Sequence, residues 1–246
     1  MGPLDGKAAL VTGGSRGIGA AIARRLAADG ADVALTYRHA RERAVEVVAD
    51  IERSGRRGIA LEADGADSAA FTDAVERTVA MLGRLDILVN NAGIFPSGPL
   101  EDVTAEDVDR TLALHTRAPF LAAQAAARQM GRGGRIISIG SCFVELVPYP
   151  GLSLYAMSKA ALTGMTKGLA RDLGARGITA TLVHPGSTDT EMNPADAPEA
   201  DAEREYIALG EYAQPEDIAA TVAHLAGDGG RYLTGAAIAV DGGFAA

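Results

Sequence analysis

Short, nearly uninterrupted apolar runs alternate along this chain with longer stretches in which apolar residues recur every three or four positions. Such runs are typical of parallel strands buried on both faces, and the longer stretches are typical of amphipathic helices. The runs predict strands at 8–12, 32–37, 58–62, 86–90, 135–140, 179–184 and 236–240. The stretches between them predict helices at 17–29, 40–53, 68–82, 104–130, 152–174 and 215–227.

This alternation predicts an α/β fold, a doubly wound parallel sheet of the Rossmann type with about seven strands and helices on both faces. No linker or internal repeat divides the sequence, so residues 1–246 are expected to form a single domain.

Residues 187–212 interrupt this rhythm between the sixth strand and the last helix. The segment is acidic, contains two prolines and leaves from the carboxyl end of a strand, where parallel sheets bind ligands. It is either a solvated surface insertion or a lid over the ligand crevice, and we expect a substrate lid.

Composition narrows the classes of function. The net charge of −9, without a basic stripe, argues against binding of nucleic acid. No apolar run approaches the ~18 residues of a membrane helix, and the N-terminus lacks the pattern of a signal peptide. The only cysteine, Cys142, excludes an internal disulfide and a cysteine-built metal site, and no other residues have metal-ligand spacing. We therefore expect a globular, cytoplasmic protein without a bound metal.

The stretch VTGGSRGIG follows the first predicted strand and opens the first predicted helix. Gly13, Gly17 and Gly19 allow the backbone to turn tightly and to approach a pyrophosphate, while the helix N-terminus offers free amides. The spacing differs from the G-x-G-x-x-G fingerprint, and a glycine cluster alone also fits a plain tight turn. Its place between a strand and a helix favours phosphate binding.

The end of the second predicted strand indicates which dinucleotide would bind. An acid here usually holds the ribose 2′-hydroxyl of NAD, but the strand ends in Tyr37, Arg38 and His39 without an acid. Together with Arg16, Arg38 would suit a 2′-phosphate, so we expect NADP(H), with NAD(H) also possible. The alternative is that both arginines are solvated. Asp64, at the end of the third strand, either accepts a bond from the adenine amino group or caps the next turn.

Further motifs lie at strand ends and on a predicted helix: NNAG at 90–93, Ser141 in SIGSC, and Tyr155 and Lys159 in YAMSK. Together with TGGSRGIG, they resemble the short-chain dehydrogenase/reductase family over nearly the whole chain. The most similar subgroup contains 3-oxoacyl-carrier-protein reductases and many alcohol or ketone reductases of similar length. The combination is highly specific, although no single motif is.

The resemblance implies an NADP(H)-dependent oxidoreductase that interconverts a small ketone or 3-oxoacyl thioester and a secondary alcohol. Tyr155 would be the general acid/base, Ser141 would orient the carbonyl oxygen, and Lys159 would hold the nicotinamide ribose. Residues 155 and 159 share a helix face, so the ammonium and a positive nicotinamide ring are expected to lower the pKa of the phenol from about 10 to about 7, which requires roughly 4 kcal/mol. The plain alternative is an ordinary exposed pair.

One position departs from the family pattern. Where the family usually has an asparagine that anchors a proton-relay water, this sequence has His115, in LALHTRAPF. A histidine can donate and accept hydrogen bonds and titrates near neutral pH. His115 is therefore a candidate catalytic residue, and the alternative is a packed side chain.

The resemblance also assigns a set of residues to the cofactor, from the glycine loop, the strand ends and the turn at Pro185 and Gly186. His184, just before that turn, is expected to be structural. The cofactor set is Gly13, Ser15, Arg16, Gly17, Ile18, Gly19, Tyr37, Arg38, Ala63, Asp64, Asn91, Ala92, Gly93, Ile139, Tyr155, Lys159, Pro185, Gly186, Thr188 and Thr190.

Two further expectations follow from the resemblance, a homotetramer and an apolar substrate pocket beside the lid around Met192. The other expected pocket residues are Phe143, Val144, Leu146, Pro148, Tyr149 and Leu152. A rival interpretation is a non-catalytic protein that binds a nucleotide signal such as cyclic di-GMP, as some members of this family do. His115 and the arginines Arg16, Arg38 and Arg41 keep that interpretation open.

Overall fold

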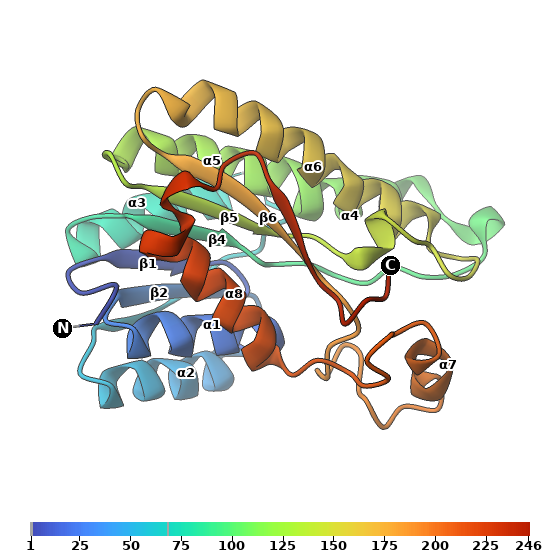
Figure 1. Cartoon of the computed structure of the whole chain (residues 1–246). Helices are drawn as coiled ribbons and strands as arrows, with labels where there is room; N and C mark the ends of the chain where they lie inside the picture. The colour runs from blue at the N-terminus through green and yellow to red at the C-terminus, as the bar shows by residue number, and fades with distance from the viewer. Residues whose placement is uncertain (1, 68) are drawn as a thin grey trace.

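A parallel sheet of seven strands runs through the middle of the molecule (Figure 1). The structure is a computed structural model that describes residues 2–67 and 69–246. The strands lie in the order β3-β2-β1-β4-β5-β6-β7, and every neighbouring pair is parallel. Their bounds are β1 (Ala8–Val11), β2 (Asp32–Tyr37), β3 (Gly58–Glu62), β4 (Ile87–Asn90), β5 (Arg135–Ile139), β6 (Thr179–Pro185) and β7 (Ala237–Val240). The predicted doubly wound α/β fold is confirmed.

Helices cover both faces of the sheet (Figure 1). One layer consists of α1 (Gly17–Ala28), α2 (Arg41–Arg53) and α8 (Pro215–Ala226). The other consists of α3 (Ala70–Leu82), α4 (Ala105–Leu112), α5 (Ala118–Gln129) and α6 (Ser153–Gly174). Short helices in the connections are η1 (Leu100–Asp102), η3 (Cys142–Val144), α7 (Ala200–Arg204) and η4 (Asp228–Tyr232). Ser68, the first residue of the predicted helix 68–82, lies outside the described residues, and none of the described helices is long and apolar enough to span a membrane.

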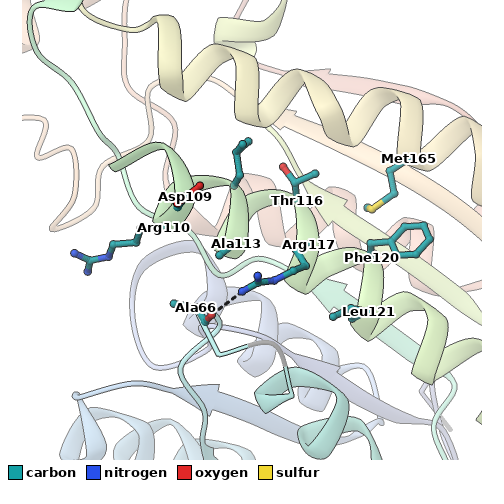
Figure 2. Close-up of a pocket in the computed structure, with 10 residues that line it drawn as sticks. Ala66, Asp109, Arg110, Ala113, Thr116, Arg117, Phe120, Leu121 and Met165 are labelled. Carbon is teal, nitrogen blue, oxygen red and sulfur yellow. Dashed lines mark hydrogen bonds between the residues drawn. The ribbon is translucent and has the colours of Figure 1, made fainter. Parts of the chain in front are cut away.

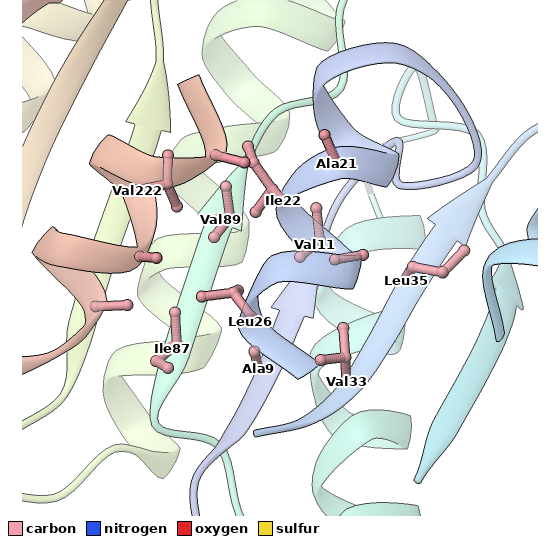
Figure 3. Close-up of a cluster of buried hydrophobic side chains, with 14 of the residues drawn as sticks. Ala9, Val11, Ala21, Ile22, Leu26, Val33, Leu35, Ile87, Val89 and Val222 are labelled. Carbon is pink, nitrogen blue, oxygen red and sulfur yellow. The ribbon is translucent and has the colours of Figure 1, made fainter. Parts of the chain in front are cut away.

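The pleat of the central strand β1 sends alternate side chains into two separate cores. Ala9 and Val11 join the core beneath α1, α2 and α8, where they lie beside Leu26 (Figure 3). Ala8 and Leu10 join the core beneath α3, α5 and α6. All four β1 side chains are at most 1% exposed. The strand therefore has no polar face, which explains the uninterrupted apolar run in its sequence.

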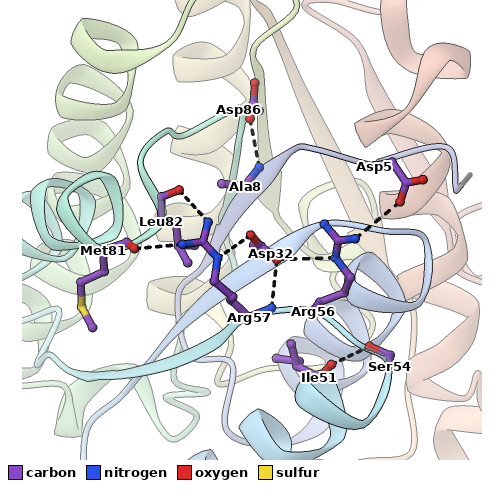
Figure 4. Close-up of polar contacts among 10 residues, drawn as sticks. All are labelled: Asp5, Ala8, Asp32, Ile51, Ser54, Arg56, Arg57, Met81, Leu82 and Asp86. Carbon is purple, nitrogen blue, oxygen red and sulfur yellow. Dashed lines mark hydrogen bonds and ion pairs between the residues drawn. The ribbon is translucent and has the colours of Figure 1, made fainter.

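Polar groups at the amino ends of the strands are paired with one another (Figure 4). Arg57 Nε donates to Asp32 Oδ2 at 2.8 Å and a second nitrogen donates to the carbonyl of Leu82, the last residue of α3. Asp86 Oδ2 accepts the backbone N–H of Ala8 at 2.9 Å. These contacts fasten the connections at one edge of the sheet and leave the opposite, carboxyl edge for the candidate site.

The stretch 104–130, predicted as a single helix, is interrupted by the π-helix η2 (Ala113–Arg117) between α4 and α5. Pro119 gives the physical reason, because it has no N–H to donate to the carbonyl four residues back in a continuous α-helix. The N–H of Ala118 donates to the carbonyl five residues back instead. Single π-turns of this kind often occur at functional sites, and this one carries His115.

Candidate active site

A cleft of about 500 Å³ lies at the carboxyl ends of the strands. It is bounded by the loop between β1 and α1, the strand ends, the first turns of α6 and part of segment 187–212. Every residue of the expected cofactor set lines this cleft, and so does Ser141. His115 lies behind the cleft wall. Among the described residues, no group of three His, Cys, Asp or Glu side chains could hold a metal ion.

The glycine loop at one end of the cleft is fixed by its neighbours. Gly13 N donates to Thr36 Oγ1 at 2.9 Å, and Asn91 Nδ2 donates to the carbonyl of Gly13 at 3.1 Å. A Cβ on Gly19 would lie 2.3 Å from that carbonyl oxygen and 2.4 Å from Asn91 Nδ2, so no side chain fits there. The first turn of α1 contains no acidic residue. The loop is thus a backbone cradle at a helix N-terminus, an arrangement that suits an anion.

The two arginines expected at a 2′-phosphate both contact carboxylates. Arg38 Nε lies 2.9 Å from Asp64 Oδ2, Arg16 lies 3.5 Å from Glu191, and Glu191 also pairs with Arg43. These side chains are 41% to 58% exposed, so each pair contributes little and a phosphate can displace the carboxylates. The second strand ends without an acid, as expected, but Asp64, just after the third strand, supplies a carboxylate that pairs with Arg38. Asp64 also accepts the backbone N–H two residues on at 3.0 Å, which is its turn-capping alternative.

The other end of the cleft, the chemical end, contains Ser141, Tyr155 and Lys159 and is built from the end of β5 and the first turns of α6. Ser141 follows β5, and its Oγ accepts the N–H of Phe143 at 3.2 Å, so it also caps η3. Tyr155 and Lys159 lie one turn apart on α6, with Lys159 Nζ 5.9 Å from the centre of the Tyr155 ring. Lys159 Nζ donates to the carbonyl of Ile139 at 3.0 Å. The expected helix face is therefore present, but the ammonium is held by the end of β5.

Burial controls the protonation of this pair. The Tyr155 ring packs against Phe95 and Phe143, with ring centres 4.8 and 6.2 Å away. Burial raises the pKa of Tyr155 to about 12, although a hydrogen bond with Ser141 acts in the opposite direction. Burial also lowers the pKa of Lys159 to about 8. Burial therefore outweighs the ammonium, which is directed at a backbone carbonyl, and the protein groups alone do not lower the pKa of Tyr155. The expected value of about 7 also depends on the positive nicotinamide ring and stays a prediction.

His115 is a buried side chain with both ring nitrogens in hydrogen bonds. Nε2 accepts the N–H of Ile94 at 2.9 Å, Nδ1 lies 2.8 Å from Ser158 Oγ, and that hydroxyl donates to the carbonyl of Tyr155 at 2.7 Å. These partners assign the neutral tautomer with its proton on Nδ1. Burial, aided by the charge of Lys159, lowers the pKa of His115 to about 3. The expectation that it titrates near neutral pH is therefore wrong, and the geometry favours the packed alternative.

His184 holds the backbone of Ser141 in place. Its Nδ1 accepts the N–H of Ser141 at 3.0 Å, and its side chain is buried. A Cβ on Gly140 would lie 2.4 Å from the same nitrogen, so a side chain at this position would displace the imidazole. The histidine thus joins the ends of β5 and β6 beside the chemical end of the cleft.

Part of segment 187–212 packs against the chemical end through an apolar cluster. Its members come from the segment, from η3, from the residue just before α6 and from the last residues of the sequence. They are Cys142, Phe143, Leu152, Ala200, Ile207, Tyr212 and Phe244. The segment is therefore folded onto the site rather than being a fully solvated insertion.

Glu203, on α7, is a residue of the cleft that sequence reasoning missed. Its carboxylate is buried and accepts four hydrogen bonds from side chains around it. In the sequence it is one acid among many in an acidic segment, and no motif or spacing distinguishes it from the others. Only the packing of α7 onto η3 separates it from its exposed neighbours.

The expected apolar pocket is only partly present. Phe143 and Met192 line the cleft, whereas Leu152 lies in the apolar cluster and Leu146 is 39% exposed. Three other expected residues do not line the cleft: Val144, the last residue of η3, and Pro148 and Tyr149 beyond it.

Comparison with known proteins identifies relatives along nearly the whole chain. A family model described as enoyl-(acyl carrier protein) reductase matches residues 13–245. The cyclic-di-GMP-binding biofilm dispersal mediator protein of Escherichia coli K12 is 44% identical over 246 residues, which cover 100% of both chains.

Solved structures match equally completely. A short-chain dehydrogenase from Burkholderia cenocepacia in complex with NADP is 59% identical, with a TM-score of 0.98 over 99% of this chain and 100% of that chain. A blue fluorescent protein from a metagenomic library in complex with NADPH is 57% identical, with a TM-score of 0.98 over the same shares.

Proposed function

The chain belongs to the short-chain dehydrogenase/reductase family of oxidoreductases, and on that premise we propose that it interconverts a small ketone or 3-oxoacyl thioester and a secondary alcohol with NADP(H). One observation carries this proposal. Ser141, Tyr155 and Lys159 line the same cleft as the glycine loop, so a dinucleotide and a carbonyl compound can meet there.

The residues of the cleft fit NADP(H). The cradle at Gly13 and Gly19 leaves room for a backbone approach to the pyrophosphate, at the free N-terminus of α1. Arg16 and Arg38 would hold the 2′-phosphate, and Lys159 would hold the nicotinamide ribose. When bound, the nicotinamide supplies or accepts the hydride. The complexes of two solved relatives with NADP and NADPH support this choice of cofactor.

The side chains at the chemical end then hold and move the proton. Tyr155 donates its phenolic proton to the carbonyl oxygen during reduction, and Ser141 donates a hydrogen bond to the same oxygen. The ammonium of Lys159 stabilises the phenolate that remains. Phe95 and Phe143 pack around the phenol and exclude water from it.

We also propose that segment 187–212 is a lid over this cleft. Glu191 of the segment contacts Arg16 in the glycine loop, at the end of the cleft where the dinucleotide phosphates would bind. Ala200 and Ile207 of the segment pack on the chemical end. A segment fastened by exposed ion pairs at one end can open there while its apolar part stays folded.

Turnover in the natural chain and in Tyr155→Phe tests the proposed function. NADPH is mixed with a panel of ketones, and loss of the nicotinamide absorbance is followed. We expect kcat to fall by about 10³-fold in the variant, because the proton donor is lost. NADPH binding, measured by fluorescence titration, should change by less than about twofold. Undiminished turnover in the variant contradicts the role of Tyr155, and absence of ketone turnover in the natural chain contradicts the function.

A second candidate function is binding of a cyclic dinucleotide, and the similarity to the Escherichia coli protein favours it. Two phosphates would suit the exposed guanidinium groups of Arg16 and Arg38, and Arg41 begins α2 nearby. His115 has no part in this argument, because it is a packed side chain. Calorimetric titration with cyclic di-GMP, with and without NADPH, separates the candidates. Tight binding without ketone turnover favours the second candidate, whereas turnover without such binding favours the first.

We further propose that a second copy of the chain covers the apolar hollow between α4, η2, α5 and α6, as part of a homotetramer (Figure 2). Phe120 is 48% exposed there, and Ala113, Leu121 and Met165 line the same hollow. An exposed apolar surface with a polar rim, here Asp109 and charged neighbours, is typical of an interface between proteins.

A further inference from the structure

Glu203 places a carboxylate in the wall of the cleft that contains Ser141 and Tyr155. It lies on α7, which the apolar cluster holds against η3. The side chain is only 9% exposed. A carboxylate is expensive to bury unless hydrogen bonds replace the water around it, so its partners explain its presence.

Four side chains donate to Glu203. Ser187 Oγ lies 2.6 Å away, Tyr212 Oη 2.9 Å, and Asn193 Nδ2 and Tyr149 Oη 3.1 Å each. Burial by itself raises the pKa of Glu203, but these four hydrogen bonds, with that from Ser187 the largest, together lower it below its usual value. Glu203 is therefore ionised throughout the neutral range.

The negative charge of Glu203 has no cationic partner in the part of the chain that the structure describes. All four donors are neutral. The adjacent Arg204 donates to Asp201 at 2.6 Å and lies over the Tyr212 ring. Lys159, the cation at the chemical end, donates to a backbone carbonyl. The cleft wall therefore carries a fixed negative charge.

The partners of Glu203 show which part of the cleft carries this charge. Ser187 directly follows Gly186, and Asn193 directly follows Met192, and all of these residues line the cleft. Three of the donors, Ser187, Asn193 and Tyr212, donate to Oε2, and Tyr149 donates to Oε1. These hydrogen bonds hold the carboxylate in one position, so its charge acts on a substrate from a fixed place in the wall.

We propose that Glu203 determines substrate charge, restricting the site to uncharged carbonyl compounds and alcohols and excluding those with a carboxylate close to the reacting carbon. The proposal rests on the proposed oxidoreductase function. A substrate carboxylate would meet a like charge where water is partly excluded, and repulsion there is several times larger than in water. An ester or thioester of the same skeleton carries no charge and avoids it.

The test uses a matched pair of ketones, ethyl acetoacetate and acetoacetate, which share the reacting carbonyl and differ by one charge. In the natural chain we expect kcat/KM to favour the ester by about tenfold or more. Glu203→Gln keeps the shape of the side chain and removes the charge, so the preference should fall by about tenfold. Glu205→Gln removes a charge from an exposed residue just beyond α7 and should leave the preference unchanged.

Two further variants separate charge from folding. Tyr149→Phe removes one donor but keeps the carboxylate, so the preference should persist. Met192→Lys adds a cation at a cleft residue that is 51% exposed, so it should fold and should improve turnover of the acid. This second variant keeps the proposal testable if Glu203→Gln does not fold, because an unchanged preference in Met192→Lys would count against it.

Several outcomes would overturn the proposal. Equal kcat/KM for ester and acid in the natural chain does so while leaving the oxidoreductase function intact. An equal slowing of both substrates in Glu203→Gln would mean that the residue only holds the segment in place. If no ketone is turned over, the proposed function fails instead. Calorimetric binding of the same pair to the NADP⁺-loaded protein then decides, and equal affinities overturn the proposal.

Discussion

Tyr155 is protonated at neutral pH, because burial against Phe95 and Phe143 raises its pKa to about 12. A protonated phenol is ready to act as an acid, so in the reaction that we propose the protein groups alone favour reduction of a carbonyl compound. Oxidation of an alcohol needs the phenolate. The positive charge for that direction has to come from Lys159 and from the oxidised cofactor together.

Titration of the phenol tests this account of Tyr155. The ultraviolet difference between the natural chain and Tyr155→Phe reports its ionisation. We expect it to ionise near pH 12 in the protein alone and at clearly lower pH when NADP⁺ is added, because a positive ring favours the phenolate. Alcohol oxidation should accordingly rise with pH, whereas ketone reduction should be flat near neutrality. A titration that ignores NADP⁺ would contradict the coupling.

His115 should make the stability of the fold depend on pH. Its folded pKa of about 3 lies below the unfolded value of 6.5, so the unfolded chain takes up the proton first. The stabilisation is fully present above pH 6.5 and is lost progressively as the pH falls towards 3. Between about pH 7 and 5, the natural chain should lose about 2 kcal/mol more unfolding free energy than His115→Asn. Denaturant unfolding at both pH values measures the difference, and equal losses would exclude this role.

At the scale of elements, the strands were predictable, whereas the interruption of the helix at 104–130 and the short helices, α7 among them, were not. Each apolar run coincides with a strand to within one residue at either end. The inner strands are apolar throughout because both of their faces are covered, whereas the edge strands β3 and β7 are only partly buried. The break in the helix at 113–117 depends on where Pro119 removes a hydrogen bond, and the sequence alone does not say whether a proline ends, kinks or widens a helix.

The glycine loop offers a test at this scale. Gly19→Ala would place a methyl group against the carbonyl of Gly13 and the amide of Asn91, so the loop has to open. We expect NADPH binding to weaken by at least about tenfold, measured by fluorescence titration. Gly168→Ala, at an exposed position inside α6 with free space around it, is the matched control. It should leave binding unchanged and stabilise the fold by about 0.5–1 kcal/mol. Equal effects of the two substitutions would refute the cradle.

At the scale of the whole molecule, the location of the cleft followed from sequence but much of its character did not. Motifs at the carboxyl ends of parallel strands meet at one edge, so the expected cofactor residues line one cleft. The pKa of Tyr155 and the burial of Glu203 depend on side chains brought from distant segments. Such contacts leave no periodic pattern in the sequence, and neither feature could be inferred before the packing was known.

A substitution in the apolar hollow around Phe120 tests the proposed assembly into a homotetramer. Phe120→Glu would place a charge in the surface that we assign to a second copy, so the mass from light scattering should fall below that of a tetramer. Val45→Glu changes a residue of α2 that is 54% exposed and lies outside the hollow, and it should leave the mass unchanged. A tetramer that survives Phe120→Glu would assign the interface to another face.

Segment 187–212 contacts both ends of the cleft, and these contacts determine the order in which the two reactants bind. Glu191 pairs with Arg16, and the Thr190 methyl lies 3.2 Å from where a Cβ on Gly17 would be, while Glu203 fastens the far end. A dinucleotide that displaces Glu191 changes the wall that the second reactant meets. Steady-state kinetics should therefore be ordered. The dinucleotide should bind before the second reactant, and the product formed from the second reactant should leave before the dinucleotide does.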